Sequence, residues 1–376
     1  MKKFIMKHSV VSFMFVYIIK AFFYLIQLVI KVDNRLILFT SFSGRSFNDS
    51  PKVVFDSLLK DSDFEEFNFV WGFRNKKKDF KYQQIKTGTF AYLIVLARAK
   101  YWISNSSIEQ LIPLNSKKHV YINTWHGVPL KFLGSDETRG NFITNNWYKK
   151  VRFDLLLSSG KYDNKLFHRI FPNTENIQLT GLPRNIELSS NLSRETAIKH
   201  INNKLKLDSN KKIILYAPTF RATSIEDRGV MRLHLSEKML EKLSSRYTLL
   251  VRPHYFVENI VPANGITDVR NLDLESLMQV SDLLITDYSS VMFDYLNLKK
   301  PIILYTYDLD DYLKKNGTYI NPKSIGLPMA NNSEQLLTTI QACFKNENSK
   351  LAEIENEFNV TSNKSLRVIK DFIKSH

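Results

Sequence analysis

The chain has 376 residues, 44% of them apolar, which is enough for two globular domains with separate cores and excludes a largely disordered protein. Its 53 Lys and Arg against 37 Asp and Glu give a formal charge of +16, which favours an anionic partner such as nucleic acid, phospholipid or a phosphorylated substrate. The single cysteine, Cys343, excludes an intramolecular disulfide and a multi-cysteine metal site, and is typical of a reducing compartment.

The first predicted element is an apolar helix near the N-terminus. It runs from Val10 to Ile30 with Lys20 as its only charge, and three lysines precede it. About 20 apolar residues can span a bilayer, whereas a central lysine costs about 2.5 to 3.5 kcal/mol on insertion scales. A spanning helix and a helix lying in the membrane surface therefore both stay open. We predict that residues 1–31 attach the protein to the cytoplasmic face of the cell membrane and are dispensable for its chemistry.

From residue 35 onward, short apolar runs alternate with longer mixed segments, a pattern typical of an α/β fold. The first set of predicted strands covers residues 36–40, 67–72, 101–104, 119–124 and 155–158, with helices over 51–60, 89–100 and 163–171. The second set covers residues 213–216, 248–252, 283–286 and 301–304. We predict two doubly wound, Rossmann-like domains facing a ligand cleft, because such sheets bind ligands beyond the carboxyl ends of their strands.

A polar stretch rich in Asn, Ser and Lys separates the two sets of strands. It predicts an inter-domain connection that carries one helix. The predicted boundaries are a membrane-associating segment at 1–31, an N-terminal domain at 32–190, a linker region at 191–210, a C-terminal domain at 211–350 and a C-terminal helix at 351–376.

The first chemically informative motif is Thr-Trp-His-Gly, residues 124–127, directly after a predicted strand. Gly127 lets the backbone turn and leaves the imidazole of His126 at the end of the strand. Because the unperturbed pKa of histidine is about 6.5, His126 can take a proton from an attacking hydroxyl group at neutral pH. The alternative is that His126 packs against Trp125 and only satisfies a buried hydrogen bond.

Two further strand ends carry cationic and hydroxyl groups. Thr219 and Arg221 follow one strand in the motif Ala-Pro-Thr-Phe-Arg, and Arg252 and His254 follow the next in the motif Arg-Pro-His. A guanidinium group can hold a phosphate through its rigid fork. Arg252 and His254 share one side of an extended chain, where either can stabilise charge on a diphosphate. The alternative for both motifs is a solvated basic turn.

The fourth motif, Thr-Asp-Tyr-Ser-Ser at residues 286–290, leads from a strand into a helix. The hydroxyl groups of Ser289 and Ser290 converge there with the backbone N–H groups of the helix start, which predicts an anion site. Asp294 lies four residues after Ser290, on the same helical face, where it can accept a hydrogen bond from a donor hydroxyl group. Asp287 is expected to cap the turn, and simple N-capping is the alternative role of both serines.

Each motif alone is common, and the sequence contains no P-loop, dinucleotide fingerprint, zinc-ligand spacing or nucleophile elbow. Their order along the chain, however, resembles the CDP-glycerol glycerophosphotransferase family of teichoic acid synthesis. The resemblance extends from about residue 36 to residue 337, and further matches are Phe42-Ser43-Gly44, Ala99-Lys100-Tyr101-Trp102, Asn105-Ser106, Leu133-Gly134 and Gly181-Leu182-Pro183-Arg184-Asn185.

The resemblance implies a GT-B-like architecture with an acceptor-side N-terminal domain, a CDP-alditol-binding C-terminal domain, and no required metal or cofactor. It implies transfer of glycerol phosphate, or a related alditol phosphate, from CDP-glycerol or another CDP-alditol to a hydroxyl group of a lipid-linked teichoic acid or capsular polymer precursor, releasing CMP. His126 is the implied general base, and His254 is a second catalytic residue. The implied donor-binding residues are Gly127, Thr219, Arg221, Arg252, Asp287, Ser289, Ser290 and Asp294.

The sequence departs from the family pattern after residue 304. Asn316-Gly317 and Gly326-Leu327-Pro328 stand in place of the usual Arg-Gly and Pro-Gly-Pro. A donor alditol other than glycerol therefore stays open. The length of the chain favours a primase over a polymerase, because polymerases of the family commonly carry an extra N-terminal domain.

Two other functions remain as alternatives. A GT-B glycosyltransferase that uses a nucleotide sugar would share the architecture, and Asp294 would then bind the donor ribose. A membrane-tethered basic nucleic-acid-binding protein would explain the charge without catalysis. However, Lys and Arg are dispersed along the chain and no known binding motif is present, so no nucleic-acid partner is expected.

Overall fold

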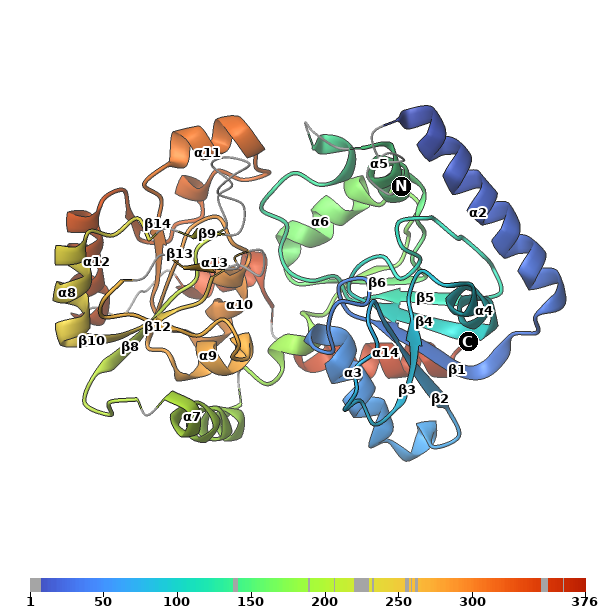
Figure 1. Cartoon of the computed structure of the whole chain (residues 1–376), viewed down its shortest axis with the longest axis horizontal. Coiled ribbons are helices and arrows are strands. Elements are labelled where there is room, and N and C mark those ends of the chain that lie inside the picture. The colour runs from blue at the N-terminus through green and yellow to red at the C-terminus, as the bar shows by residue number, and fades with distance from the viewer. Residues whose placement is uncertain are drawn as a thin grey trace. The chain divides into compact units, whose positions relative to one another are not determined.

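The computed structural model describes residues 8–137, 141–188, 190–205, 207–219, 230–231, 233–253, 257, 259–260, 263–345, 351–360 and 362–376. The chain forms two compact units, which are described separately (Figure 1). Unit 1 comprises Met1–Val128, Phe132–Ile186 and Val360–His376, and unit 2 comprises Pro129–Lys131 and Glu187–Asn359.

Unit 1 is built on a seven-stranded parallel sheet with the strand order β3-β2-β1-β4-β5-β6-β7. Its central strands are mostly buried apolar runs, as expected for a parallel sheet covered on both faces. The strands are β1 (Asp33–Thr40), β2 (Asn68–Phe73), β3 (Gln83–Lys86), β4 (Ala99–Ser104), β5 (Val120–Asn123), β6 (Leu155–Ser158) and β7 (Ile177–Leu179).

The helices of unit 1 lie before, between and after these strands in the chain. They are α2 (Ser9–Val29), α3 (Asp49–Leu59), η1 (Ser62–Phe64), α4 (Phe90–Arg98), η2 (Gly134–Asp136), α5 (Phe142–Lys150), α6 (Lys161–Ile170), η3 (Pro183–Asn185), η6 (Ser362–Lys364) and α14 (Ser365–Lys374), where η marks a 3-10 helix.

Helix α14 returns the C-terminal part of the chain to unit 1 (Figure 1). Its residues Ile369 and Ile373 are buried in the apolar cluster that contains Phe55 of α3 and Trp71 of β2. The hydroxyl group of Tyr101 on β4 donates to the carbonyl of Ile373 over 3.0 Å. Unit 1 therefore contains segments from both ends of the described chain, and most of unit 2 lies between them in sequence.

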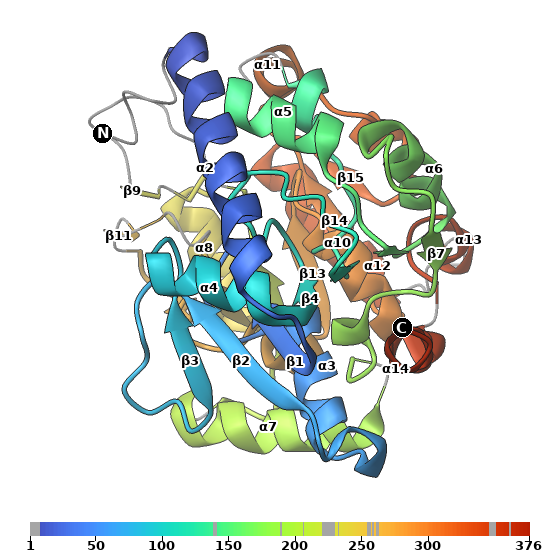
Figure 2. The ribbon, with the colours of Figure 1, turned by 90° about the vertical axis from the view of Figure 1, so that its right-hand side faces the viewer.

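Helix α2 packs along unit 1 against α4 and α5 (Figure 2). Ser12, Val16, Phe23 and Gln27 are its buried residues, and their spacing places them on one face of the helix. The ring of Phe23 contacts that of Trp102 at a centroid distance of 6.2 Å. Many other apolar side chains of α2 stay exposed, namely Val10, Phe13, Met14, Phe15, Tyr17, Ile18, Phe22, Tyr24, Leu25, Leu28 and Val29.

Unit 2 is built on a six-stranded parallel sheet with the order β12-β10-β8-β13-β14-β15, and a separate pair joins β9 and β11. The strands are β8 (Lys212–Tyr216), β9 (Val230–Met231), β10 (Tyr247–Val251), β11 (Asn259–Ile260), β12 (Thr267–Asp268), β13 (Leu283–Thr286), β14 (Ile302–Tyr305) and β15 (Met329–Ala330). The helices are α7 (Asn191–Leu205), α8 (Glu237–Arg246), α9 (Leu274–Val280), α10 (Val291–Tyr295), η4 (Leu296–Leu298), α11 (Leu309–Asn316), η5 (Pro322–Ser324), α12 (Ser333–Lys345) and α13 (Leu351–Phe358).

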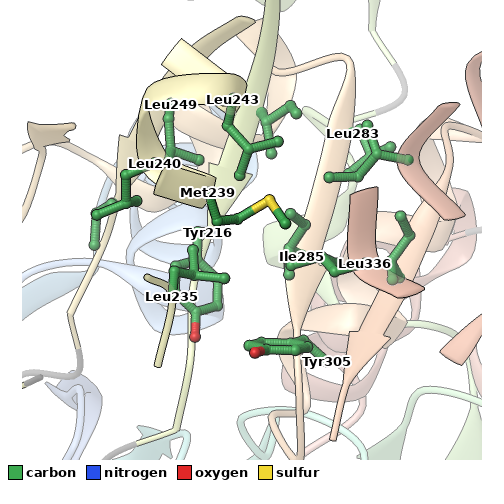
Figure 3. Close-up of a cluster of buried hydrophobic side chains, with 14 of the residues drawn as sticks. Tyr216, Leu235, Met239, Leu240, Leu243, Leu249, Leu283, Ile285, Tyr305 and Leu336 are labelled. Carbon is green, nitrogen blue, oxygen red and sulfur yellow. The ribbon is translucent and has the colours of Figure 1, made fainter. Parts of the chain in front are cut away.

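The apolar core of unit 2 lies between its sheet and two helices that pack on it (Figure 3). Met239 and Leu243 of α8 belong to one buried cluster with Ile285 of β13, Tyr305 of β14 and Leu336 of α12. This cluster fixes the strands whose carboxyl ends carry the predicted motifs of unit 2.

Both sheets share one strand order when the strands of each sheet are numbered along the chain: third, second, first, fourth, fifth, sixth, and the unit 1 sheet adds a seventh strand at its end. The order reverses between β1 and β4 in unit 1, and between β8 and β13 in unit 2. Ligands of doubly wound sheets bind at such switch points, outside the carboxyl ends of the strands. The predicted α/β architecture with two doubly wound sheets is confirmed.

Candidate functional site

The loop after β5 presents His126 at the carboxyl edge of the unit 1 sheet. The N–H of Thr124 still donates to the carbonyl of Ser104 at 2.9 Å, and the backbone then turns through Trp125 at φ 54° and Gly127 at φ 126°. Trp125 is buried, whereas His126 is half-buried. A Cβ atom disfavours positive φ angles, so glycine at position 127 permits the turn that holds His126 at the strand end.

The hydrogen bond of His126 defines the tautomer of its ring. The Nδ1 atom lies 2.5 Å from the carbonyl oxygen of Asn105. A carbonyl oxygen can only accept a hydrogen bond, so Nδ1 carries a proton, and in the neutral ring Nε2 carries the lone pair. His126 can therefore accept the proton of a hydroxyl group through Nε2, as a general base must.

Burial lowers the pKa of His126 below its ordinary value of 6.5. The hydrogen bond to the Asn105 carbonyl and the charge of Asp49 oppose this shift, while the charge of Arg184 adds to it. The imidazole is therefore neutral at pH 7, which is the form that a general base needs.

Three strand-end loops are joined around His126. The N–H of Phe42, after β1, donates to Oδ1 of Asn105, after β4, at 2.7 Å, and the N–H of Ser43 donates to the hydroxyl group of Ser106 at 2.8 Å. The rings of Phe42 and His126 contact edge to face, with their centroids 5.8 Å apart. Phe42 and Ser43 have φ angles of 47° and 54°, which cost about 1–3 kcal/mol each in residues other than glycine. Such strain is typical of functional sites.

A network of buried hydrogen bonds supports the turn formed by Asn105 and Ser106. The Ser106 carbonyl accepts from Nδ2 of Asn123 at 2.9 Å and from the hydroxyl group of Tyr121 at 3.1 Å. Glu109 accepts from Tyr121 at 2.9 Å and from the indole N–H of Trp147 at 2.7 Å. Burial raises the pKa of Glu109, and these hydrogen bonds oppose that shift. The network fixes the turn on which the His126 hydrogen bond depends.

A buried ion pair also acts on His126. Nη1 of Arg184 lies 2.6 Å from Oδ2 of Asp49, and the two side chains are only 10% and 4% exposed. The N–H of Arg184 donates to the hydroxyl group of Ser50 at 3.3 Å, which ties η3 to the start of α3. Since the two charges shift the pKa of His126 in opposite directions, the pair limits how strongly either charge biases the base.

At the switch point of unit 2, Asp287 joins the loops after β8 and β13. Its buried carboxylate accepts from the N–H of Thr219 at 2.9 and 3.1 Å, from the hydroxyl group of Thr219 at 2.6 Å, and from the N–H of Tyr288 at 2.5 Å. Asp287 thus orients both loops, in line with the capping role expected from the sequence.

Ser289 and Ser290 lie half-buried at the start of α10. The hydroxyl group of Ser289 accepts from the N–H of Val291 at 3.4 Å, and Ser290 is the N-cap residue without a side-chain capping bond. Helix α10 has only five residues, so its dipole is weaker than that of a longer helix, and an anion here would depend on the N–H and hydroxyl groups themselves. Asp294 is buried on the same helix.

The guanidinium group of Arg252 donates to the carbonyl of Leu272, just before α9. Burial lowers the pKa of Arg252, and the charges of Glu275 and Asp273 oppose the shift. The two remaining predicted residues, Arg221 and His254, lie outside the described part of the chain.

The fold adds four residues to the surroundings of His126 that the sequence did not mark as site residues. Asn105 and Arg184 occurred only in supporting motifs, and Asp49 and Glu109 occurred in none. Only tertiary contacts place them there, because each is distant from His126 in sequence. Within the described ranges, no group of three or more His, Cys, Asp or Glu is arranged to hold a metal ion.

Two doubly wound sheets, with a histidine beside one switch point and a hydroxyl-bearing turn at the other, are an architecture used by α/β transferases. A family model for CDP-glycerol:poly(glycerophosphate) glycerophosphotransferase matches residues 22–365. The chain belongs to this family, which confirms the resemblance drawn from its motifs.

Named relatives agree with this assignment. The chain is 32% identical over 356 residues to a teichoic acid poly(glycerol phosphate) polymerase of Bacillus spizizenii, which covers 88% of this chain and 87% of the relative. It is 34% identical over 316 residues to the polymerase of Staphylococcus epidermidis, but spans only 43% of that protein's length. A solved structure of the wall teichoic acid polymerase TagF matches with a TM-score of 0.82 at 29% identity, covering 94% of this chain and 92% of that one.

Proposed function

We propose that the protein transfers glycerol phosphate, or a closely related alditol phosphate, from a CDP-activated donor to a hydroxyl group of a lipid-linked polymer precursor, and releases CMP. Membership of the family and the names of its relatives support this reaction class. One observation carries the mechanism: Nδ1 of His126 donates to the Asn105 carbonyl at 2.5 Å, which leaves Nε2 as a proton acceptor.

In the proposed step, Nε2 of His126 removes the proton of the acceptor hydroxyl group. The acceptor oxygen forms a bond to the β-phosphorus of the donor, and the bond from that phosphorus to the bridging oxygen breaks. The bridging oxygen and its electron pair leave with CMP, while the proton stays on the imidazolium until solvent removes it. Positioning and charge stabilisation provide most of the catalysis in such phosphoryl transfers.

Unit 2 is the proposed donor-binding unit. The carboxylate of Asp287 holds the two loops at its switch point, and the half-buried residues Ser289 and Ser290 follow Asp287 in the same turn. These groups and the backbone N–H groups of the turn are suited to phosphate oxygens. From the family resemblance, Arg221 remains a proposed donor-site residue and His254 a proposed second catalytic residue.

The reaction is tested by incubating purified protein with CDP-glycerol, CDP-ribitol or a UDP-sugar in the presence of a lipid-linked acceptor. CMP release with a matching mass increase of the acceptor supports the proposal, and the productive donor identifies the alditol. UDP release from the sugar nucleotide, with no CMP from either alditol, would instead identify a glycosyltransferase.

Chain length does not separate a primase from a polymerase. The Bacillus spizizenii polymerase is matched over 87% of its own length, so a polymerase of this family need not carry a large additional domain. The length of the chain therefore does not favour a primase. The number of glycerol phosphate units added, read by mass spectrometry of the product, decides between the two.

Helix α2 is the proposed membrane-binding element. It is long and apolar enough to cross a membrane, but its buried face packs on unit 1, so we place it in the membrane surface at the cytoplasmic face. Lys118 and Lys150 donate to the Gln27 carbonyl and the Tyr17 hydroxyl group at 2.8 and 2.9 Å, and so border the helix with positive charge. Each such group contributes about 1 kcal/mol near an anionic leaflet.

The outward face of α2 can be tested without disturbing its inward face. Ile18 and Leu25 are 61% and 60% exposed, so Ile18→Gln with Leu25→Gln should weaken sedimentation with anionic vesicles by about tenfold or more. Ile198→Gln, at a 37% exposed residue of α7, is the matched control. Equal vesicle binding by all three proteins would remove α2 as the attachment element.

A further inference from the structure

We propose that Asn105 is the positioning residue of the catalytic base: its backbone carbonyl holds His126 in the Nδ1–H tautomer, and its side-chain amide holds that carbonyl in place. This inference rests on the proposed function of His126. Asn105 acts through His126 and is not expected to touch the substrate.

The geometry of Asn105 supports two separate tasks. Its carbonyl accepts from Nδ1 of His126 at 2.5 Å, and its Oδ1 accepts from the N–H of Phe42 at 2.7 Å. Because an N–H group can only donate, the second bond also fixes which end of the amide is the oxygen. Asn105 therefore forms hydrogen bonds both to the loop after β1 and to the ring of His126.

Unit 2 has an equivalent hydrogen bond at the equivalent position of its sheet. Asp287 is the first residue after β13, the fourth strand of the six-stranded sheet along the chain, as Asn105 is the first residue after β4, the fourth strand of the unit 1 sheet. The Asp287 side chain accepts from the N–H of Thr219 in the loop after β8, the first strand of that unit. Both switch points are therefore bridged by a side-chain oxygen that accepts from the loop after the first strand.

The difference between the two units has a physical reason. A carboxylate at position 105 could accept from Phe42 just as well, but its negative charge would stabilise the protonated imidazole of His126 and raise its pKa. An amide provides the same acceptor without the charge. The amide is kept although its Nδ2 is buried and has no hydrogen-bond partner within the described residues, a feature that disfavours folding.

The test compares Asn105→Ala and Asn105→Asp, with Asn146→Ala as the control. Asn146 is another buried asparagine of unit 1 whose Nδ2 has no partner in the described part of the chain, and it lies on α5. Asn105→Ala should lower kcat by about 10- to 100-fold with little change in the KM of the donor. Asn105→Asp should retain kcat at high pH but shift the acid limb of its pH profile upward. Asn146→Ala should match the wild type.

A second measurement reads the tautomer without turnover. Long-range proton–nitrogen NMR of protein labelled at its eight histidines, with His126 assigned by its absence in His126→Ala, should show Nδ1–H in the wild type and in Asn105→Asp. It should show a mixture of tautomers in Asn105→Ala. Circular dichroism confirms that each variant is folded.

Two results overturn the inference: an Nε2–H tautomer in the wild type, or an unchanged tautomer and kcat in folded Asn105→Ala. Failure of the proposed function looks different, because His126→Ala would then retain transfer while the NMR spectra still show Nδ1–H at His126. The two outcomes are therefore distinguishable in one set of proteins.

Discussion

The Nε2 atoms of Gln27 and His119 lie 2.5 Å apart, joining α2 to the residue just before β5. Nδ1 of His119 is 2.6 Å from the carbonyl oxygen of Ala99, so it carries the proton, and Nε2 accepts from the Gln27 amide. The ring also stacks on Trp102 at a centroid distance of 4.6 Å. His119 is therefore held neutral, and its protonation would break the contact with α2.

This contact makes stability sensitive to acid. Burial lowers the pKa of His119 from 6.5 to about 4. Between pH 6.5 and pH 4 the imidazole of His119 is protonated in the unfolded chain but neutral in the folded one. The free energy of unfolding should therefore fall by about 3 kcal/mol as the pH drops from about 6.5 to about 4. Urea unfolding at several pH values should show a smaller decline in His119→Gln than in the wild type. Replacing the exposed His168 should leave the decline intact, and an equal decline in His119→Gln would contradict the assignment.

Helix α2 should matter for folding as well as for attachment. Phe23 is buried against unit 1, so Phe23→Ala should destabilise the protein by about 3–5 kcal/mol, measured by urea unfolding. Phe15→Ala, at a 36% exposed position of the same helix, should cost far less. Deleting residues 1–31 should therefore expose the apolar surface around Trp102 and reduce solubility. A soluble, equally stable truncated protein would show that α2 is dispensable for folding.

His126→Ala should reduce transfer by about 100- to 10,000-fold while donor binding survives, because a missing general base has this effect. CMP release measures transfer, and calorimetry with CDP measures binding. His168→Ala, at an exposed histidine of α6, is the matched control. Near-normal activity of folded His126→Ala would make this histidine structural.

The pH profile of the reaction should reflect the environment of His126. Because burial lowers its pKa, the base stays unprotonated below the ordinary histidine value, and the acid limb of kcat/KM should have its midpoint below 6.5. Asp49→Asn removes a charge that raises this pKa, so it should shift the midpoint further down. A midpoint above 6.5 in the wild type would contradict the assignment.

Substitutions in unit 2 should act on the donor. Ser290→Ala and Arg252→Gln should weaken binding of both CDP-glycerol and CDP, because both ligands carry the diphosphate. Ser245→Ala, at an exposed serine of α8, should not. Arg252 also donates to the Leu272 carbonyl, so thermal unfolding must show that Arg252→Gln is folded. Unchanged CDP affinity in both site variants would remove this pair from the donor site.

The sequence predicted the central strands because buried parallel strands are continuous apolar runs, as in β1, β8 and β13. It missed β3, whose residues Gln-Gln-Ile-Lys show no apolar pattern because an edge strand is partly solvated. It also extended the helix at 89–100 into β4. No glycine or proline marks the point where α4 ends at Arg98 and the strand begins at Ala99.

The site was predictable only where its residues follow strands directly. His126 stands in such a position, but the partner that fixes its tautomer, Asn105, is 21 residues away. The ion pair of Asp49 and Arg184 joins residues 135 positions apart, so no local pattern can indicate it. Contacts between residues this far apart in sequence depend on the order of the strands in the sheet. No single motif in the sequence indicates that order.

The placement of α14 affects how the protein forms during translation. Ile369 and Ile373 complete the core of unit 1, but the ribosome makes them after the whole of unit 2. The C-terminal unit can therefore close before α14 is made, whereas part of the apolar interior of the N-terminal unit stays open until α14 has emerged from the ribosome. This reverses the usual N-to-C order of cotranslational domain folding. A ribosome stalled just before α14 should thus carry a chain whose second half resists protease and whose first half does not.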